Sequence, residues 1–406
     1  MSRAGLPAFA VVTAAYWAFM LTDGALRMLV LLHFNMLGFT PVQLAFLFVL
    51  YEVAGIVTNL AAGWIGARFG LALTLRMGLA VQIAALLALA ALDPAWGVAL
   101  SVVWVMAVQG LSGVAKDLTK MASKSAVKRL APPEGLFRWV AALTGSKNAV
   151  KGLGFLLGAA LMALAGFHAA VLGMAAVLAA ILLAVLVAMP PGLSMGRKGE
   201  KFTEFLSGSR NINWLSAARV FLFGARDVWF VVGIPVYFTA VLSDGTDEGR
   251  RLAFFLVGGF MAVWVMLYGA VQAAAPRVLR AGTRPDSALI RDASRWAAVL
   301  ALVPAVLAAA VWAQVPALTA VLVLGLLVFG AVFAVNSALH SFLILSFSTD
   351  ERVTRDVGFY YMANAAGRLA GTLMSGLTFQ AGGLVLVLVT AAAMLAASAL
   401  CAARLR

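Results

Sequence analysis

The sequence predicts an all-α membrane protein with about twelve transmembrane helices in two six-helix bundles. Hydrophobic residues make up 64% of the 406 residues and charged residues only 11%, with a mean hydropathy of +1.00. Soluble domains are roughly half apolar and about a quarter charged, so this composition indicates a chain that lies mostly in lipid. A spanning helix needs about 20 apolar residues, and with its loops the chain accommodates twelve spans at roughly 34 residues each.

Apolar runs separated by loop residues mark the individual spans. Runs such as 169–189 and 384–403 are apolar on all sides, as lipid-exposed or packed spans must be. The first run has no small-residue cleavage site, so we interpret it as a retained span and not as a signal peptide. The expected spans are 8–34, 42–66, 71–92, 97–121, 138–165, 169–189, 214–241, 252–275, 295–314, 318–347, 357–380 and 384–403.

The loop cations predict the orientation of the chain. If the N-terminus is cytoplasmic, the cytoplasmic segments hold 20 Lys and Arg residues, whereas the outer loops hold only Arg250 and Arg251. Because cytoplasmic loops carry such an excess, we expect both termini inside and an even number of spans. In a soluble protein a net charge of +14 would indicate nucleic acid. Here the charges fall mostly in short loops, so we expect no nucleic-acid partner.

The longest polar stretch, 190–213, lies near the middle of the chain and reads as a cytoplasmic linker. It separates an N-terminal bundle, 1–189, from a C-terminal bundle, 214–406. The two halves echo each other, because Asn-Ala-Val-Lys-Gly-Leu at 148–153 in the fifth span parallels Asn-Ala-Ala-Gly-Arg-Leu at 364–369 in the eleventh. Two halves repeated in parallel are how the major facilitator fold is built.

A glycine-rich loop motif follows the second span. The segment Gly63-Trp-Ile-Gly-Ala-Arg-Phe-Gly70 is similar to the major facilitator loop motif Gly-x-x-x-Asp-Arg-x-Gly and occupies the same loop. Glycines let helix ends approach closely, and an arginine can bond the terminal carbonyls of a helix. The match is incomplete, since Ala67 replaces the aspartate of the motif. Helix packing is the alternative reading of these glycines.

Charges within the spans point to the function. Eight of the 30 cations lie within or at the ends of spans, against four of the 16 acids, which leaves a surplus of four positive charges. A charge at mid-membrane costs about 2.5–3.5 kcal/mol on insertion scales, so such residues face the bundle interior and are usually functional. The cations are Arg27, Lys116, Lys120, Lys147, Lys151, Arg219, Arg226 and Arg368, and the acids are Asp23, Glu52, Asp117 and Asp227.

Two lysine ladders carry the most specific part of this pattern. Lysines recur every fourth residue in the fourth span, at Lys116, Lys120, Lys124 and Lys128. Residues spaced in this way share one helix face. Lys147 and Lys151 repeat the spacing in the fifth span. A solvated helix end explains Lys124 and Lys128 but not Lys116, so we expect the ladders to attract a multiply charged anion.

Arginines and amides supply the other candidate ligands. Arg27, Arg226 and Arg368 offer guanidinium forks that suit phosphate-like oxyanions. Asn148 and Asn364 occupy matching positions in the halves and could orient a ligand or, alternatively, bridge helices.

Several of these charges have structural alternatives. Arg219 and Lys120 are near cytoplasmic helix ends and could snorkel to water. Asp23 and Arg27 are four residues apart and could form an ion pair within one helix. The adjacent residues Arg226 and Asp227 point in different directions on a helix, so we expect each to pair with other helices. The same expectation holds for Lys116 and Asp117.

The interior carboxylates Asp23, Glu52, Asp117 and Asp227 are candidates for coupling or gating. Of these, Asp23 and Glu52 are candidates for proton coupling, because burial raises a carboxyl pKa while a nearby cation lowers it. We expect no metal site, since His33, His168 and His340 share no ligand spacing and Cys401 is the single cysteine. His340 lies in a polar stripe and could line a pathway or pack in the core.

Other protein classes fit the sequence poorly. No Gly-x-x-x-x-Gly-Lys-Ser/Thr motif for nucleotides occurs, so transport would be secondary or facilitated and need no cofactor. A receptor or a membrane enzyme would call for a sensor domain or a catalytic cluster, and the sequence offers neither. An exporter of lipophilic cations would have an acidic interior.

Four segments closely resemble the ArsJ-type organoarsenical efflux permeases, a branch of the major facilitator superfamily. The resemblance spans most of the chain and is specific, because charged transmembrane segments of this kind are rare elsewhere in the superfamily. The segments are AYWAFMLTDGALRMLVLLHF (15–34), GLSGVAKDLTKMASKSAVKRL (110–130), ALTGSKNAVKG (142–152) and SAARVFLFGARDVWFVVGIPVYF (216–238).

The resemblance implies a substrate and a partner. In that family a glyceraldehyde-3-phosphate dehydrogenase makes 1-arseno-3-phosphoglycerate, which the permease exports and which then releases arsenate outside. We hypothesise that one oxyanion end meets Lys116, Lys147 and Lys151 and the other meets Arg27, Arg226 and Arg368. We expect a monomer in the bacterial inner (cytoplasmic) membrane. An exchanger of sugar phosphates or glycerol phosphate fits the cationic interior equally well.

Overall fold

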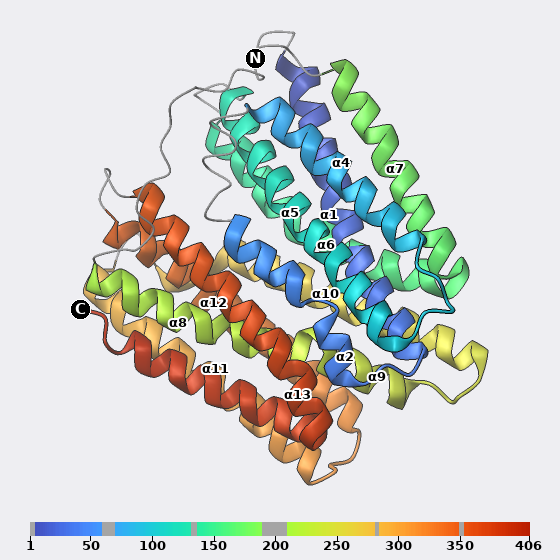
Figure 1. Ribbon diagram of the computed structural model, residues 1–406. Coiled ribbons are helices and arrows are strands. Elements are labelled where there is room, and N and C mark those ends of the chain that lie inside the picture. The colour runs from blue at the N-terminus through green and yellow to red at the C-terminus, as the bar shows by residue number, and fades with distance from the viewer. Residues whose placement is uncertain (1–4, 59–69, 131–135, 189–208, 281–283, 349–352) are drawn as a thin grey trace. The chain divides into compact units, whose positions relative to one another are not determined.

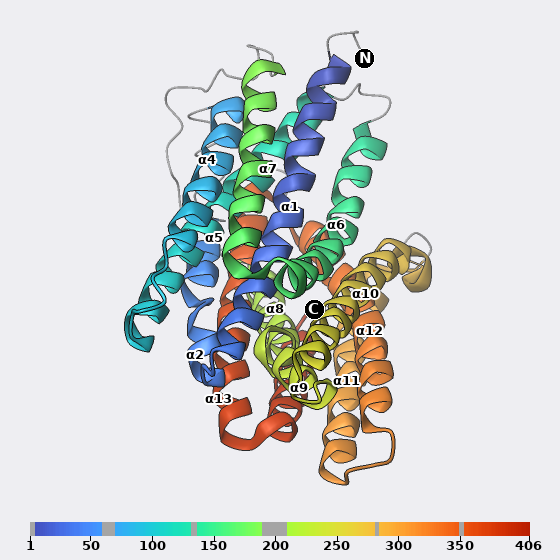
Figure 2. The ribbon, with the colours of Figure 1, turned by 90° about the vertical axis from the view of Figure 1, so that its right-hand side faces the viewer.

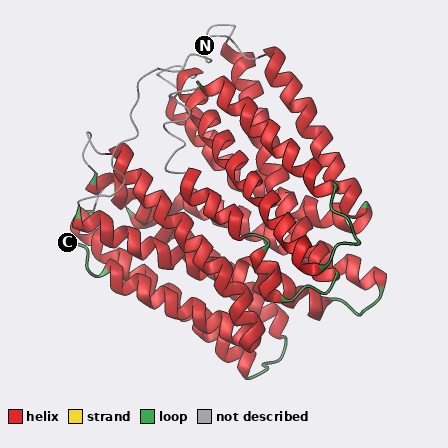
Figure 3. Ribbon diagram, viewed as in Figure 1, coloured by secondary structure: helices red, strands yellow, loops and turns green. Residues whose placement is uncertain are grey.

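The computed structural model describes the chain apart from residues 1–4, 59–69, 131–135, 189–208, 281–283 and 349–352. Among the described residues every regular element is a helix, and no strand occurs (Figure 3). The all-α prediction is therefore confirmed. The expected linker lies mostly outside the described residues, and so does the loop motif except for its last glycine. Gly70 has a φ of 81°, in the region that favours glycine.

The number of spans agrees with the sequence. Eleven helices in the described part of the chain are long and apolar enough to cross a membrane. The last of them, α13 (Val353–Ala402), is interrupted by non-helical backbone at Gly382 and Gly383. At this kink α13 reverses direction (Figure 2), so it comprises two successive spans. With α13 divided there, the described residues provide the twelve spans that the sequence predicts.

The chain forms two compact units, and the first comprises Met1–His33, Val57–Thr203 and Phe254–Ala262. Within it, α4 and α5 lie side by side (Figure 1). Gly78 of α4 makes this approach possible, because a Cβ at this position would collide with Thr119 of α5. The helices of this unit are most of α1 (Gly5–Met36), α4 (Leu71–Ala90), α5 (Val98–Leu130), α6 (Leu136–Leu164), α7 (Gly166–Ala188) and the middle of α10 (Asp247–Leu279).

The second unit comprises Phe34–Ile56, Glu204–Ala253 and Val263–Arg406. It contains α2 (Pro41–Phe46), α8 (Arg210–Val228), the π-helix η3 (Trp229–Gly233), α9 (Ile234–Leu242), the two ends of α10, α11 (Asp286–Trp312), α12 (Leu318–Phe347) and α13. The division into bundles 1–189 and 214–406 stays a prediction.

An aromatic core stabilises the second unit next to its charged residues. Trp229 at the start of η3 packs edge-on against Trp264 of α10 and Phe329 of α12, with ring centroids 5.3 Å apart in both pairs. The indole nitrogen of Trp264 donates a hydrogen bond of 2.8 Å to the carbonyl of Leu326. Buried aromatic rings contribute large apolar area in a fixed geometry. This core therefore holds the end of α8 in place.

Candidate functional site

The four interior carboxylates are deeply buried, with no more than 3% of each residue exposed: Asp23, Glu52, Asp117 and Asp227. Buried charges must be paired or hydrogen-bonded, because desolvation of an isolated ion is very costly. Two of these carboxylates belong to the first unit and two to the second. Each pair organises its own group of cations.

In the first unit, a close helix crossing brings Asp23 against Lys151. The ammonium of Lys151 on α6 lies 2.9 Å from a carboxylate oxygen of Asp23 on α1. The helices cross at glycines: a Cβ at Gly24 would lie 2.6 Å from the carbonyl oxygen of Lys151. A Cβ at Gly154 would collide with the carbonyl of Leu21. Small residues allow backbones to approach in this way, so these glycines position the ion pair.

The second carboxylate of this unit, Asp117, gathers the inner part of the lysine ladder. The hydroxyl of Thr58 donates a hydrogen bond of 2.7 Å to Asp117. Lys120 lies 3.5 Å from the same carboxylate, and the buried Lys116 lies 3.8 Å from it. The expectation that Lys116 and Asp117 pair with other helices holds for Asp117, which Thr58 contacts, but Lys116 also lies within ion-pairing distance of its own neighbour because the lysine stem is long enough to fold back.

The remaining candidates of the first unit lie nearby along the same helices. Arg27 is buried one turn after Asp23 on α1. Lys147 and Asn148 lie one turn before Lys151 on α6 and are half-buried. The side chains of the outer two ladder lysines, at 124 and 128, lie outside the described residues.

In the second unit, four charged side chains form one connected network. A nitrogen of Arg368 on α13 lies 2.6 Å from Glu52, and the Nε of Arg368 donates a 3.2 Å hydrogen bond to Asp227 on α8. The other oxygen of Asp227 accepts a 2.6 Å hydrogen bond from the Nε of Arg226. Two cations thus alternate with two carboxylates. Such charge-assisted hydrogen bonds are roughly twice as strong as neutral ones.

This network partly overturns the expectation for adjacent charges. Asp227 does reach another helix, through Arg368, but Arg226 bonds to its own sequence neighbour. The long arginine side chain spans the angular separation of the two positions. Its guanidinium also lies 4.9 Å from the centre of the Phe223 ring and 5.7 Å from that of Phe333. Cation–π contacts of this kind stabilise a desolvated arginine.

Glycines again allow the helix crossing that carries the network. A Cβ at Gly367 of α13 would collide with the carbonyl of Val220 on α8, and one at Gly371 would collide with the carbonyl of Gly224. Arg368 follows the first of these glycines, and Asp227 lies one turn after Gly224. The crossing therefore places the two charged side chains within bonding distance.

A π-helix follows the charged residues directly. The segment Trp229–Gly233 widens into a π turn just before Pro235. Proline lacks an N–H and its ring clashes with the carbonyl four residues earlier, which favours such a distortion. The amides of Val232 and Gly233 both donate to the hydroxyl of Ser375 at 3.1 Å. Such π turns occur frequently at functional sites.

Arg219 is not among the predicted binding residues, but the structure places it in the interior of the second unit. Only 4% of this residue is exposed, so it does not snorkel to water. Its Nε donates to Asn364 at 3.0 Å, and its Nη1 donates to the carbonyl and hydroxyl oxygens of Ser337 at 3.1 and 3.2 Å. The sequence signal was present: Arg219 precedes Arg226 by seven residues, which places both on one face of α8.

Two fully buried polar side chains of α12 belong to the same unit. Both side-chain atoms of Asn336 and both ring nitrogens of His340 have no hydrogen-bonding partner among the described residues. These residues are four apart and so share one helix face. Buried polar groups without partners are rare in folded proteins and call for an explanation.

The charge balance differs between the units. Of the charges that the sequence places within spans, the first unit holds five cations and two carboxylates, whereas the second holds three cations and two carboxylates. Each unit therefore has a surplus of positive charge by itself, of three and one. A low-dielectric surrounding makes such a surplus attractive to anions.

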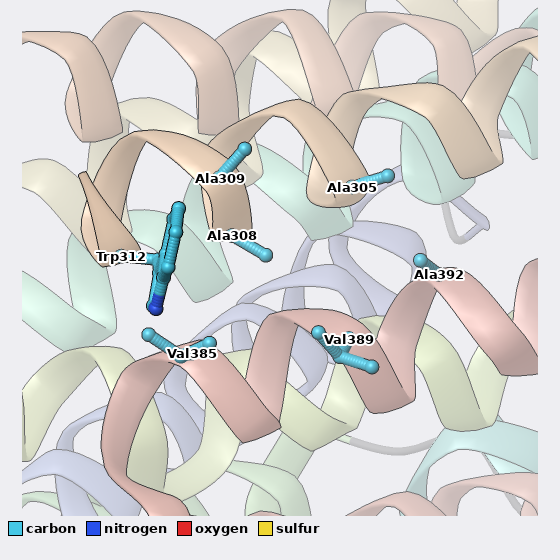
Figure 4. A pocket seen from close by; sticks show the side chains of 7 residues that line it. All are labelled: Ala305, Ala308, Ala309, Trp312, Val385, Val389 and Ala392. Carbon is cyan, nitrogen blue, oxygen red and sulfur yellow. The ribbon is translucent and has the colours of Figure 1, made fainter.

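An apolar pocket in the second unit is unsuited to an anion. It encloses about 390 Å³ beside α11 and the last part of α13 (Figure 4). The side chain of Trp312 at the end of α11 points towards Val385 there. The lining residues are all apolar: Ala305, Ala308, Ala309, Trp312, Val385, Val389 and Ala392. Among the side chains that line this pocket, the indole N–H of Trp312 is the one polar group.

Comparisons with known proteins agree with the helical architecture. The model of a family described as the Major Facilitator Superfamily matches residues 8–291. The nucleoside transporter NupG has a similar structure, with 15% identity, 98% of both chains covered and a TM-score of 0.73. A bacterial homologue of the iron transporter ferroportin is also similar, with 15% identity, 97% of this chain and 99% of that chain covered, and a TM-score of 0.71. No curated protein matches the sequence.

Proposed function

The chain belongs to the major facilitator superfamily and is a secondary transporter, and we propose that it exports 1-arseno-3-phosphoglycerate, an anionic organoarsenical, from the cytoplasm. Such export confers resistance to arsenate. The observation that carries the proposal is the surplus of positive charge within the spans of each unit. A substrate with an oxyanion at each end of a short polar body matches this distribution.

The cations within the spans supply the binding groups. One oxyanion contacts Lys116, Lys147 and Lys151, with Lys120 attracting it from nearby. Arg27, Arg226 and Arg368 contact the other, and Asn148 and Asn364 orient the polar body of the substrate. Lysine contributes compact point charge, whereas the arginine fork forms two parallel hydrogen bonds with phosphate-like groups.

The interior carboxylates act in coupling or gating. In the structure Asp23 contacts Lys151, Asp117 contacts Lys116 and Lys120, and Glu52 and Asp227 contact Arg368. An arriving oxyanion competes with these carboxylates for the same cations. The carboxylates then neutralise the cations when no substrate is bound, which lowers the cost of the unloaded state in the bilayer.

The cellular setting forms part of the proposal. We place this multi-pass protein in the bacterial inner membrane, as a monomer with both termini in the cytoplasm. Glyceraldehyde-3-phosphate dehydrogenase is the functional partner, because it joins arsenate to the triose phosphate and so produces the substrate. The ester is unstable and releases arsenate outside the cell.

Resistance in cells tests the pathway. Arsenate resistance is expected only when this chain and the dehydrogenase are expressed together. Cells that lose the chain become sensitive, and cells that lose the dehydrogenase become equally sensitive because no ester forms. Resistance that is unchanged after deletion of the chain contradicts the proposal.

Everted vesicles test the cationic pathway and the driving force. Lys147→Gln, Lys151→Gln and Arg226→Gln are expected to reduce uptake of the ester at least tenfold, whereas the exposed Arg251→Gln leaves it unchanged. Wild-type uptake by the three interior variants, at equal protein levels, rejects the pathway. Uptake measured with and without a proton gradient separates proton antiport from uniport.

An exchanger of sugar phosphates or glycerol phosphate is the second candidate, since the same charge surplus favours it. Uptake of sugar phosphate in exchange for phosphate, without any organoarsenical transport, would select it. The iron of the ferroportin homologue is a less suitable cargo, because a cation would be repelled by the interior surplus of positive charge.

A further inference from the structure

Arg219 differs from the other interior arginines of the second unit. Arg226 and Arg368 each contact a carboxylate, so their network of four residues is electrically balanced. Within the part of the chain that the structure describes, no carboxylate lies within ion-pairing distance of Arg219. Among Arg219, Arg226 and Arg368, Arg219 is therefore the one without a carboxylate partner in the described part of the chain. A buried arginine without a carboxylate is suited to an external anion.

The guanidinium of Arg219 is held with one edge unused. Its hydrogen bonds to Asn364 and Ser337 involve Nε and Nη1. In the described part of the chain no protein atom accepts a hydrogen bond from Nη2, which carries two further N–H groups. The ring centroids of Phe223 and Tyr360 lie 3.9 and 4.9 Å from the guanidinium carbon. These contacts fix its plane before a ligand arrives.

Neutral polar groups without partners accompany this cation. His340 follows Ser337, which accepts hydrogen bonds from Arg219, by one turn of α12. Asn336, on the same helix face as His340, is fully buried as well. An amide and an imidazole together offer both donors and acceptors. Leaving such groups unpaired costs about 1–3 kcal/mol each, a cost that a polar ligand removes.

We propose that Arg219, Asn336 and His340 form an oxyanion-binding subsite of the second unit. Arg219 binds a phosphoryl, arsenyl or carboxylate group through its Nη2 edge. Asn336 and His340 form neutral hydrogen bonds to the hydroxyl or ester oxygens beside that group. This subsite rests on the proposed function, because it requires that the substrate is an anion. It adds Arg219 to the anion contacts that the proposed function assigns to Arg226 and Arg368 in this unit.

Ligand binding by the purified full chain in detergent tests this subsite. The probes are inorganic phosphate and 3-phosphoglycerate, a stable anion with two charged ends, and the readout is the ligand-dependent rise of the unfolding temperature. Arg219→Gln is expected to weaken binding of both probes at least tenfold, and Arg219→Lys less strongly. The exposed Arg251→Gln serves as the control with wild-type affinity.

Asn336→Leu separates a binding role from a structural one. Leucine has a similar shape and removes two unpaired polar atoms, so this variant is expected to unfold at a higher temperature without ligand. A binding role requires that it also loses at least threefold in affinity for 3-phosphoglycerate. A purely structural role predicts lower stability and unchanged affinity. The variant remains informative if Arg219→Gln does not fold.

The outcomes distinguish the subsite from the proposed function. If the wild type binds the probes and the Arg219 and Asn336 variants bind them equally well, the subsite is wrong and the proposed function stands. If Arg219 is required for binding but vesicles transport no organoarsenical, the subsite stands and the proposed function fails. A wild-type chain that binds neither probe overturns both.

Discussion

Each unit contains a helix crossing at glycines that carries an ion pair, but the charges around the pair differ between the units. In the first unit, α1 and α6 cross at glycines and bring Asp23 against Lys151. In the second unit, α8 and α13 cross at glycines and bring Asp227 against Arg368. The first helix of each pair supplies the carboxylate and the second supplies the cation. The crossing and its ion pair thus recur in both units, although the cation is displaced by one position in the sequence repeat, where Lys151 aligns with Gly367.

The surroundings of the two ion pairs differ. The second pair is extended at both ends, by Glu52 and Arg226, into a balanced network. The first unit keeps a surplus of three cations within its spans. Burial does not distinguish the pairs, since the side chains of Lys151 and Arg368 are 20% and 18% exposed and those of Asp23 and Asp227 are 2% and 1% exposed. The same kind of crossing therefore carries a balanced network of four charges in one unit and an ion pair among surplus cations in the other.

The largest expected effect comes from Asp227→Asn. The substitution leaves Arg226 and Arg368 facing each other with Glu52 as the remaining carboxylate. Removing one partner from a buried ion pair destabilises a protein by about 3–5 kcal/mol, so we expect a loss of this size. Thermal unfolding in detergent measures it, with Asp227→Glu as the charge-conserving control. Wild-type stability of the Asn variant would show that the network is not structural.

Alanine at the crossing glycines tests whether the two crossings are equivalent. Gly154→Ala and Gly367→Ala each place a methyl group against a backbone carbonyl of the neighbouring helix. Overpacking of this kind costs about 1–3 kcal/mol, and we expect similar losses in both units. Gly173→Ala on α7 is the matched control, because a Cβ there meets open space. A loss confined to one unit would break the equivalence.

Asp23→Asn is expected to have a smaller effect than Asp227→Asn. Loss of Asp227 leaves two arginines facing each other, whereas loss of Asp23 exposes one lysine, whose long stem can carry its ammonium towards water. We expect a loss of about 1–2 kcal/mol of stability, typical of a charged hydrogen bond. Adding Lys151→Met should restore much of it, because no uncompensated cation remains. A loss equal to that of Asp227→Asn would remove the proposed difference between the units.

Much of the fold could be predicted from the sequence, because lipid imposes long apolar helices. The sequence predicts a boundary between the eleventh and twelfth spans at 380–384, and in the structure α13 is kinked there, at Gly382 and Gly383. Likewise, the buried interior charges were identified from their cost in lipid alone. Composition and spacing suffice for such properties, since they depend on local sequence.

The partners of these charges could not be predicted. Glu52 and Arg368 are in contact although they lie 316 positions apart in the sequence, and no local pattern specifies such a contact. The direction of Arg226 depends on the aromatic rings around it, which tertiary packing brings together. The sequence predicts that Arg219 lies near a helix end, because the number of a residue in the sequence does not show how deeply its side chain is buried among neighbouring helices. The compensated and uncompensated arginines differ only in these tertiary contacts.

The smallest expected effect concerns the π turn, a feature of α8–α9 that α1 lacks among its described residues. Ser375→Ala removes the hydroxyl that accepts from the amides of Val232 and Gly233, which costs about 1 kcal/mol. Hydrogen exchange should quicken at these two amides. Thr22→Val on α1 is the counterpart, since the Thr22 hydroxyl only donates to carbonyls of its own helix. Equal effects of the two substitutions would show that Ser375 does not stabilise the π turn specifically. The charges within the spans would then be the remaining difference between the two units.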